Sequence, residues 1–355
     1  MSHSGRRNQL VRYLRAQQME GALVFSWRRG AVSWLTGYTP GFVTNQAALW
    51  QPVDGDPQLG VRFPFEKERA SRVSGIPTIT YKEVAQLIPG GIRSIGLIAG
   101  DMAVDESLPH LSAGLEARGI DYIDLRAWTD DAQEAKLPAE IAALRRAGEV
   151  AAASLMACGA VPPVGWRDYQ VAAAVEYQAR TLGASRATCL VGIGAGSFVT
   201  ECTNQSVRPG DQVCIELTIY VDGWCMHVNH SLIPGAPRPG ARLADQVCRE
   251  ARFALVSAMR PGLPVDEIVR AGDDVLRRHK LLAHKEYDFG HGVGSDTPQH
   301  PRLIDGTNRE IAVNSVVAVH VAVRAPDGPT GFVGGPVLVG PEATVELVPG
   351  APWTA

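Results

Sequence analysis

The stretch FGHGVGSDTPQH, residues 289–300, places a histidine between two glycines near the end of the 355-residue chain. Glycine has no Cβ, so the backbone on either side of His291 can come close to a bound group. Such a histidine is a candidate for a reactive centre, and the two acids that flank the glycine segment, Asp288 and Asp296, could orient it from outside that centre. The partners of His291 therefore have to be sought elsewhere in the sequence.

Three other side chains are candidates for that role. Residues 212–235 predict two strands joined by a turn at Asp222–Gly223, with Glu216 on the first strand and His227 on the second. Polar groups on paired strands can face one pocket. His320 interrupts the apolar run VVAVHVAV, residues 316–323, where an imidazole without a partner would cost free energy.

Composition limits the classes of function. The chain has 34 Lys and Arg against 37 Asp and Glu, a net charge of -3, so nothing attracts it as a whole to nucleic acid or to an anionic membrane. No apolar run reaches about 18 residues, and the first residues do not resemble a signal peptide. We therefore expect a cytoplasmic protein that acts on a small-molecule substrate, without nucleic-acid or membrane partners.

Hydrophobic periodicity indicates an α/β chain in two parts. Residues 6–122 alternate an amphipathic helix with apolar strands such as GALVF at 21–25 and SIGLIAG at 94–100. A long helical pattern then opens at Pro138. We expect one domain over residues 1–132 and a second over residues 133–355.

The second part resembles the pita-bread metalloenzyme family, which includes methionine aminopeptidase, aminopeptidase P, prolidase and creatinase. The segments that carry the resemblance follow the family's order, and they are LPAEIAALRRAGEVA (137–151), RPGDQVCIEL (208–217), YVDGWC (220–225), PGLPVDEIV (261–269) and GHGVG (290–294). GALVFSWRRGAVSWLTGY, residues 21–38, is similar to a creatinase-type N-terminal domain. The resemblance implies an α/β (α+β) fold, with a creatinase-like N-terminal domain and a C-terminal pita-bread domain, in a homodimer.

Peptidases of that family bind two metal ions through two Asp, one His and two Glu. On this sequence the first Asp falls on Glu216 and the second on His227, with the family's spacing preserved. The His is His291, and the Glu on the following strand falls on His320. The last Glu falls on the pair Gly334–Gly335, which offers no ligand.

These replacements remove negative charge that would hold two dications side by side. We expect one transition metal ion (Fe, Zn, Mn, Ni or Cu) held by His227, His291 and His320, with Glu216 as fourth ligand or general base. Glu216 and His291 are the predicted catalytic residues. The hypothesis is a non-peptidase, creatinase-like enzyme that transforms a small nitrogen-containing molecule, with hydrolysis preferred and oxidation left open.

Two other interpretations remain open at this point. In the first, no metal binds, and Glu216 and the three histidines catalyse C–N hydrolysis by acid–base chemistry, as the resemblance to creatinase implies. In the second, the chain is a non-catalytic binding module built on a degenerate pita-bread domain. His230 is expected to be structural, because strand alternation turns it away from His227.

Five residues are predicted to contact substrate. The resemblance implies that the N-terminal domain closes the pocket of a dimer partner, through Tyr38 and Phe42. Glu201 takes the position of an upstream family histidine, and His300 lies near that of a downstream one. Trp224 is a further candidate for the rim of the pocket.

Overall fold

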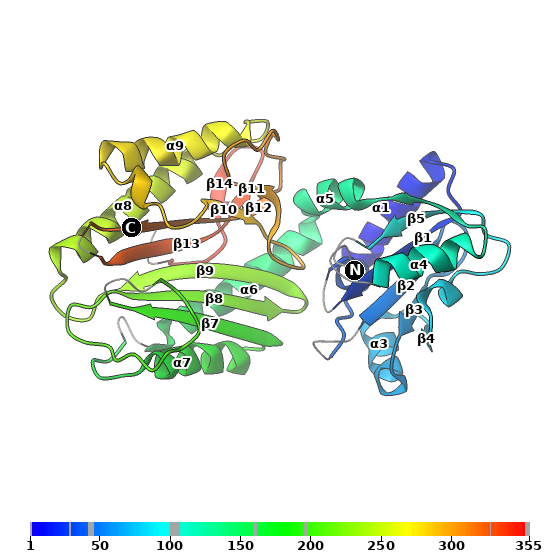
Figure 1. Cartoon of the computed structure of the whole chain (residues 1–355), viewed down its shortest axis with the longest axis horizontal. Helices are drawn as coiled ribbons and strands as arrows, with labels where there is room; N and C mark the ends of the chain where they lie inside the picture. The colour runs from blue at the N-terminus through cyan, green and yellow to red at the C-terminus, as the bar shows by residue number, and fades with distance from the viewer. Residues whose placement is uncertain are drawn as a thin grey trace. The chain divides into compact units, whose positions relative to one another are not determined.

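The computed structural model describes residues 2–27, 30–41, 46–99, 107–158, 162–194, 198–326 and 328–351. The chain forms two compact units, Met1–Ala132 and Gln133–Ala355, each with its own β-sheet (Figure 1). Within the described residues, no helix combines the length and hydropathy that a membrane span requires.

The first unit is a six-stranded mixed sheet with the strand order β4-β3-β2-β1-β5-β6. Strand β1 pairs antiparallel with β2 and parallel with β5. The elements are α1 (Ser2–Ala16), β1 (Gly21–Trp27), α2 (Ala31–Thr36), β2 (Gln46–Pro52), β3 (Gln58–Val61), α3 (Lys67–Ser74), β4 (Thr78–Thr80), β5 (Ser94–Ile98), α4 (Ser107–Glu116), β6 (Asp121–Asp124) and, at the boundary, α5 (Arg126–Glu134).

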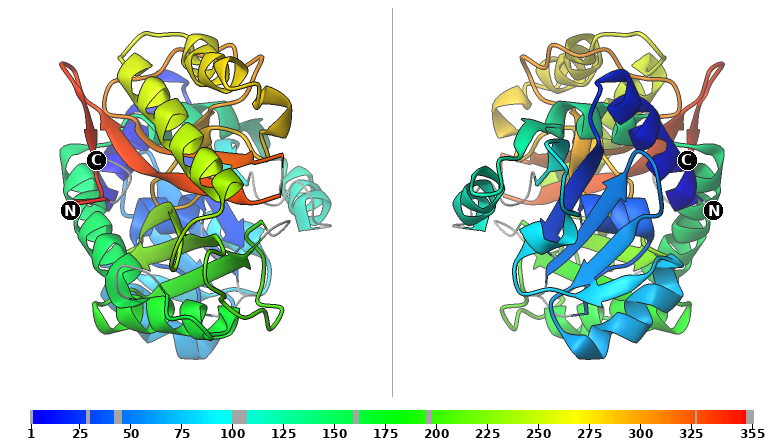
Figure 2. Two further views of the ribbon diagram at one scale, coloured as in Figure 1. Left: turned by 90° about the vertical axis from the view of Figure 1, so that its left-hand side faces the viewer. Right: turned by 90° about the vertical axis from the view of Figure 1, so that its right-hand side faces the viewer.

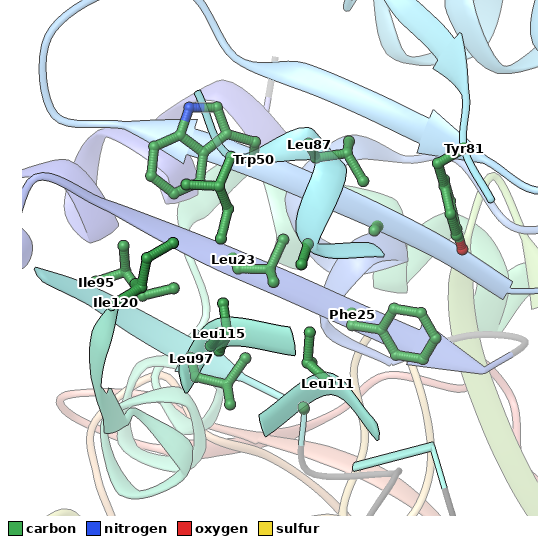
Figure 3. Close-up of a cluster of buried hydrophobic side chains, with 14 residues drawn as sticks. Leu23, Phe25, Trp50, Tyr81, Leu87, Ile95, Leu97, Leu111, Leu115 and Ile120 are labelled. Atoms are coloured by element: carbon green, nitrogen blue, oxygen red, sulfur yellow. The ribbon is translucent and has the colours of Figure 1, made fainter. Parts of the chain in front are cut away.

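An apolar core holds this unit together. Leu111 and Leu115 of α4 pack with Leu23 of β1 and Leu97 of β5, and Trp50 of β2 extends the same cluster (Figure 3). These side chains are almost fully buried. Because side chains alternate between the two faces of a strand, the apolar residues of β1, β2 and β5 in this cluster lie on the face that α4 covers.

The second unit contains an eight-stranded sheet in the order β11-β10-β12-β13-β9-β8-β7, with β14 paired to β13. Its helices and strands are α6 (Pro138–Leu155), α7 (Asp168–Thr181), β7 (Arg186–Ile193), β8 (Val213–Val221), β9 (Trp224–Leu232), α8 (Pro239–Ala258), α9 (Val265–Arg278), β10 (Gly290–Gly292), β11 (Gln299–Arg302), β12 (Val316–Arg324), β13 (Thr330–Val339) and β14 (Thr344–Glu346). The predicted hairpin is β8 and β9, which pair from Val213–Leu232 to Val221–Trp224.

Helices pack against this sheet. Helix α8 lies across β12 and β13, and α9 packs beside α8, while α6 and α7 pack against β7, β8 and β9 (Figure 2). Gly331 faces α8, because a Cβ there would meet the backbone of Ala244. By strand alternation, Phe332 and Gly334 face the opposite side of the sheet, away from α8.

Candidate metal centre

Three histidines from three strands converge on one side of the second sheet. His227 comes from β9, His291 from β10 and His320 from β12. Each offers a ring nitrogen within 4.8 Å of those of the other two. The ring centroids lie 5.2 Å apart for His227 and His291, 5.7 Å for His227 and His320, and 5.4 Å for His291 and His320.

Strand pairing explains why these side chains meet. Glu216 of β8 lies opposite Asn229 of β9, Asn229 opposite Gly334 of β13, and Gly334 opposite His320 of β12. Residues in such a row project from the same face of a sheet. His227 is two residues before Asn229, so alternation puts it on that face as well.

Gly290 turns His291 toward the site. Its φ of +134° is a conformation that residues with a Cβ rarely adopt, and a Cβ there would overlap the carbonyl oxygen of Ala318. Phe289, on the other side of this glycine, packs near Gly272 of α9. The backbone reversal at Gly290 therefore lets Phe289 and His291 face different layers.

Hydrogen bonds fix the orientation of two of the rings. The Nδ1 atom of His227 lies 3.0 Å from the hydroxyl oxygen of Thr218, and its Nε2 has no hydrogen-bond partner. Nδ1 of His291 lies 3.1 Å from the carbonyl oxygen of Gly292 and 3.2 Å from the hydroxyl oxygen of Thr297. Each ring therefore keeps Nε2 for another group.

His320 is the most buried of the three, with no exposed surface, and within the described part of the chain neither ring nitrogen has a hydrogen-bond partner. Its Nε2 lies 3.9 Å from Oδ1 of Asp288. Asp288 is held by Arg302, whose Nη2 lies 2.9 Å from Oδ2, and by the backbone N–H of Gly290. A carboxylate beside a ligating imidazole is a common second partner in metal sites.

Burial keeps these imidazoles neutral. It lowers the pKa of His227 to about 3, with a further contribution from His291. Burial also lowers the pKa of His291, and it lowers the pKa of His320 well below the ordinary value, with help from the two other histidines. Neutral imidazoles have the lone pair that a metal requires, so the unpaired buried nitrogens fit a transition ion.

Glu216 lies on the same face of the sheet, but its carboxylate does not belong to the group of mutually close donor atoms. Burial raises the pKa of this carboxyl to about 7. Glu216 therefore shares a face of the sheet with the histidines, and its role as fourth ligand or general base stays a prediction. A carboxyl that titrates near neutral pH is suited to accept and return a proton.

Three aromatic side chains form a cluster beside His320. The ring of Tyr287 is 5.2 Å from that of His320 and 6.3 Å from that of Phe198, and the ring of Phe332 is 5.8 Å from His320 and 5.0 Å from Phe198. Tyr287 is 45% exposed, whereas His320 and Phe332 are fully buried. Sequence reasoning did not find Tyr287, although it lies only four residues before His291.

The predicted substrate contacts lie in different environments. Glu201 is exposed, and His300 is half-buried on β11 beside Gly292 of β10. Trp224 is 3% exposed at the start of β9, which leaves it little surface for a rim. Tyr38 is fully buried, and its hydroxyl donates to Glu66 within the first unit.

Phe42 lies outside the described residues. His230 is buried, and burial lowers its pKa to about 3, with a smaller contribution from Arg249 of α8. His230 is not one of the three histidines whose ring nitrogens lie close together. Strand alternation predicted this, because it turns His230 away from His227.

Comparison with known proteins gives one family and several relatives. The model for metallopeptidase family M24 matches residues 142–345. The Xaa-Pro dipeptidase of Pyrococcus furiosus is 23% identical over 282 residues, which cover 77% of this chain and 79% of that protein. A methionine aminopeptidase from Buchnera aphidicola is 25% identical over 107 residues, 30% of this chain and 40% of that protein.

Solved structures agree with the fold. A prolidase from Pyrococcus horikoshii OT3 superposes with a TM-score of 0.83 at 18% identity, over 97% of this chain and 98% of that one. An X-Pro aminopeptidase from Thermotoga maritima MSB8 gives a TM-score of 0.85 at 16% identity, over 96% of both chains. The predicted α/β fold of the prolidase and aminopeptidase P type is confirmed.

The predicted activity is wrong. The sequence suggested a non-peptidase, creatinase-like enzyme and not an ordinary metallopeptidase, but the relatives are named Xaa-Pro dipeptidase, Xaa-Pro aminopeptidase and methionine aminopeptidase. The same names count against the oxidative, metal-free and non-catalytic alternatives. The prediction fails because it equates the changes at the ligand positions with a loss of peptidase chemistry.

Proposed function

The chain belongs to metallopeptidase family M24, and from that membership we propose that it is a metal-dependent peptidase that hydrolyses a dipeptide-sized substrate. The observation that carries the proposal is the convergence of three neutral, buried imidazoles from three strands of one sheet. Burying three such groups together costs free energy unless something pairs with their nitrogens. A metal ion is the partner that all three can share.

We propose one transition ion, of Fe, Zn, Mn, Ni or Cu, with His227, His291 and His320 as its ligands. Three imidazoles suit ions of this group and leave further positions open for substrate and water. When bound, the ion would polarise the carbonyl group of the scissile peptide bond. Gly334 supports a single ion, because a Cβ there would collide with His320 and no side chain could supply another ligand.

Glu216 is proposed as the proton carrier. Its raised pKa, caused by burial, matches a group that accepts a proton from water and then returns it to the leaving nitrogen. His291 acts in the reaction as a ligand that Gly292 and Thr297 orient. Tyr287 would offer the entering substrate apolar surface, because its ring lies 5.2 Å from that of His320 and is 45% exposed, and Phe198 lies beside Tyr287.

Xaa-Pro dipeptides are the substrates to try first, because several relatives are named for that class. Glu201 and His300 are proposed to contact the substrate, since both keep exposed surface. We retain a cytoplasmic homodimer, with Tyr38, Phe42 and Trp224 near the pocket, as a further proposal. It is supported by the likeness of residues 21–38 to creatinase-type domains.

The experiment is a hydrolysis assay on protein reconstituted separately with each of the five ions. Release of proline from several Xaa-Pro dipeptides would be measured beside matched Xaa-Gly dipeptides. We expect hydrolysis with at least one ion, and loss on the order of 10³-fold in His320→Ala. His230→Ala is the matched control, since this buried histidine lies outside the group. Absence of dipeptide hydrolysis with every ion would contradict the proposal.

A further inference from the structure

The side chain of Asn229 is buried, and its amide makes no hydrogen bond to any described residue. It has no exposed surface, and neither Nδ2 nor Oδ1 of its carboxamide has a partner among the residues that the structure describes. Buried amides are nearly always paired, because an unpaired one loses the hydrogen bonds that water gave it. A group that the protein itself does not supply is therefore expected at this side chain.

The neighbours of Asn229 define where that group would lie. Glu216 is opposite Asn229 on one side and Gly334 on the other, and His320 follows Gly334 in the same row. No side chain stands on Gly334, and none could, because its Cβ would collide with His320. In this row Gly334 lies between Asn229 and His320, and Glu216 lies on the other side of Asn229, so a group bound at the amide would lie beside Glu216.

The chemistry of the unpaired atoms limits the occupant. Nδ2 needs an acceptor and Oδ1 needs a donor. A bare cation would satisfy only Oδ1, and a simple anion only Nδ2. Water satisfies both, and it can also donate to Glu216. Buried waters usually make two to four hydrogen bonds, which these groups supply.

We propose that Asn229 is a positioning residue for the water molecule whose proton Glu216 accepts. The inference rests on the proposed peptidase function. One O–H bond of the water breaks and its proton moves to Glu216, while the oxygen forms a bond with the carbonyl carbon of the substrate and the π electron pair of the carbonyl moves to its oxygen, from which it re-forms the double bond when the amine leaves. The C–N bond then breaks, its electron pair stays on the nitrogen, and Glu216 returns the proton to that nitrogen.

Replacement of Asn229 by leucine, which has a similar volume, tests this role. Asn229→Leu should lower kcat on the order of 10²-fold and leave KM within about twofold, because the water and not the substrate loses a partner. Metal content should stay at the wild-type value, because Asn229 is not one of the three histidines that hold the ion. Asn229→Ser, which keeps a donor and an acceptor, should recover part of kcat.

Thr330→Val is the matched control. The Thr330 hydroxyl is also buried without a partner on β13, but it lies four residues from Gly334, about 13 Å along the strand. This change should leave both kcat and KM unaltered. If Asn229→Leu also left kcat unaltered, or lowered it only as far as Thr330→Val does, the proposal would be overturned.

A crystal structure of the metal-loaded wild-type protein at high resolution separates this inference from the proposed function. A water within hydrogen-bonding distance of both amide atoms of Asn229 and of Glu216, absent in Asn229→Leu, is the expected result. A metal ion or no density at this place would overturn the inference. If the water is present but no dipeptide is cleaved, the peptidase proposal fails while the water site stands.

Discussion

Burial acts in opposite directions on the histidines and on the acid of the site. It lowers the pKa of His227 to about 3 and raises the pKa of Glu216 to about 7, because in each case it disfavours the charged form. The imidazoles therefore keep free lone pairs at neutral pH. The carboxyl exchanges its proton in the range where an amide hydrolase would need it.

Glu216 should make the metal-free protein less stable as the pH rises. Between the ordinary pKa of 4.5 and the folded value of about 7, the unfolded chain has lost this proton while the folded chain keeps it. The contribution of the Glu216 carboxyl to the free energy of unfolding therefore falls as the pH rises through that window. Relative to wild type, Glu216→Gln should gain free energy of unfolding on the order of 2 kcal/mol between pH 4.5 and pH 7.5.

Urea unfolding of the two metal-free proteins across this pH range measures the difference directly. Other ionisable groups contribute equally to both and cancel. Two curves that stay parallel from pH 4.5 to pH 7.5 would show that the Glu216 carboxyl has an ordinary pKa.

The sequence pointed to the three histidines of the cluster. It did not point to the hydroxyl and amide side chains that lie beside them. His227, His291 and His320 could be found because imidazoles are unusual among glycines or apolar strand residues, and because their order matched a known family. Thr218 and Thr297 could not, because hydroxyl side chains are common on strands and turns. Asn229 could have been found, since alternation puts it on the face of His227, opposite Glu216.

At the level of elements, the site depends on strands that pair with residues far away in sequence. The segment around His291 is one of them, because Gly290–Gly292 is strand β10 and pairs with β11 and β12. Three residues rich in glycine have little intrinsic preference for a strand, so long-range pairing decides their structure. The hairpin of β8 and β9 could be predicted, because its turn and its apolar residues are local signals.

Gly290 should tolerate no side chain. Gly290→Ala would force a Cβ against the carbonyl of Ala318 at a φ of +134°, so we expect a loss of stability of about 3 kcal/mol or more and loss of metal binding. Gly262→Ala is the control, because its φ is also positive, +78°, but its surroundings are open. It should cost about 1 kcal/mol. Equal losses in thermal unfolding would mean that the close approach at Gly290 does not matter.

Arg252 joins helix α8 to the strands behind the site. Its guanidinium donates to the carbonyls of Val319 and Gly335 and pairs with Glu346 at 2.6 Å. Val319 and Gly335 are the direct neighbours of His320 and Gly334. The buried face of α8 thus supports the row of residues that carries the site.

Replacing Arg252 by methionine should cost about 3 kcal/mol, since it leaves buried carbonyls and a carboxylate without their donor. Arg277→Met, which removes an exposed ion pair with Asp274 on α9, should change the free energy of unfolding by no more than about 0.5 kcal/mol. Chemical denaturation of both variants gives the comparison. Similar small effects in both would show that Arg252 does not anchor α8.

At the scale of the whole molecule, the two units have separate sheets, and all three histidines lie in the second. The order of motifs along the chain was enough to predict this fold, because the sheet and its covering helices follow that order. The activity could not be predicted in the same way. Substitutions at the ligand positions alter the chemistry of one site. Membership of the peptidase family depends instead on the sequence pattern of residues 142–345.

Residues 133–355 should fold and bind metal without the first unit. The sheet, its helices and the three ligands all belong to that unit. We expect a cooperative thermal transition and a metal affinity within about tenfold of that of the full chain, measured by circular dichroism and calorimetric titration. A fragment that unfolds on heating without cooperativity would show that the second unit needs the first.

The central claim is that His227, His291 and His320 hold one transition metal ion, and elemental mass spectrometry of the purified, untagged protein tests it most directly. About one equivalent is expected in wild type and in His230→Ala, and almost none in His227→Ala, His291→Ala or His320→Ala. Wild-type metal content in the three ligand variants, or loss in His230→Ala alone, would contradict the site.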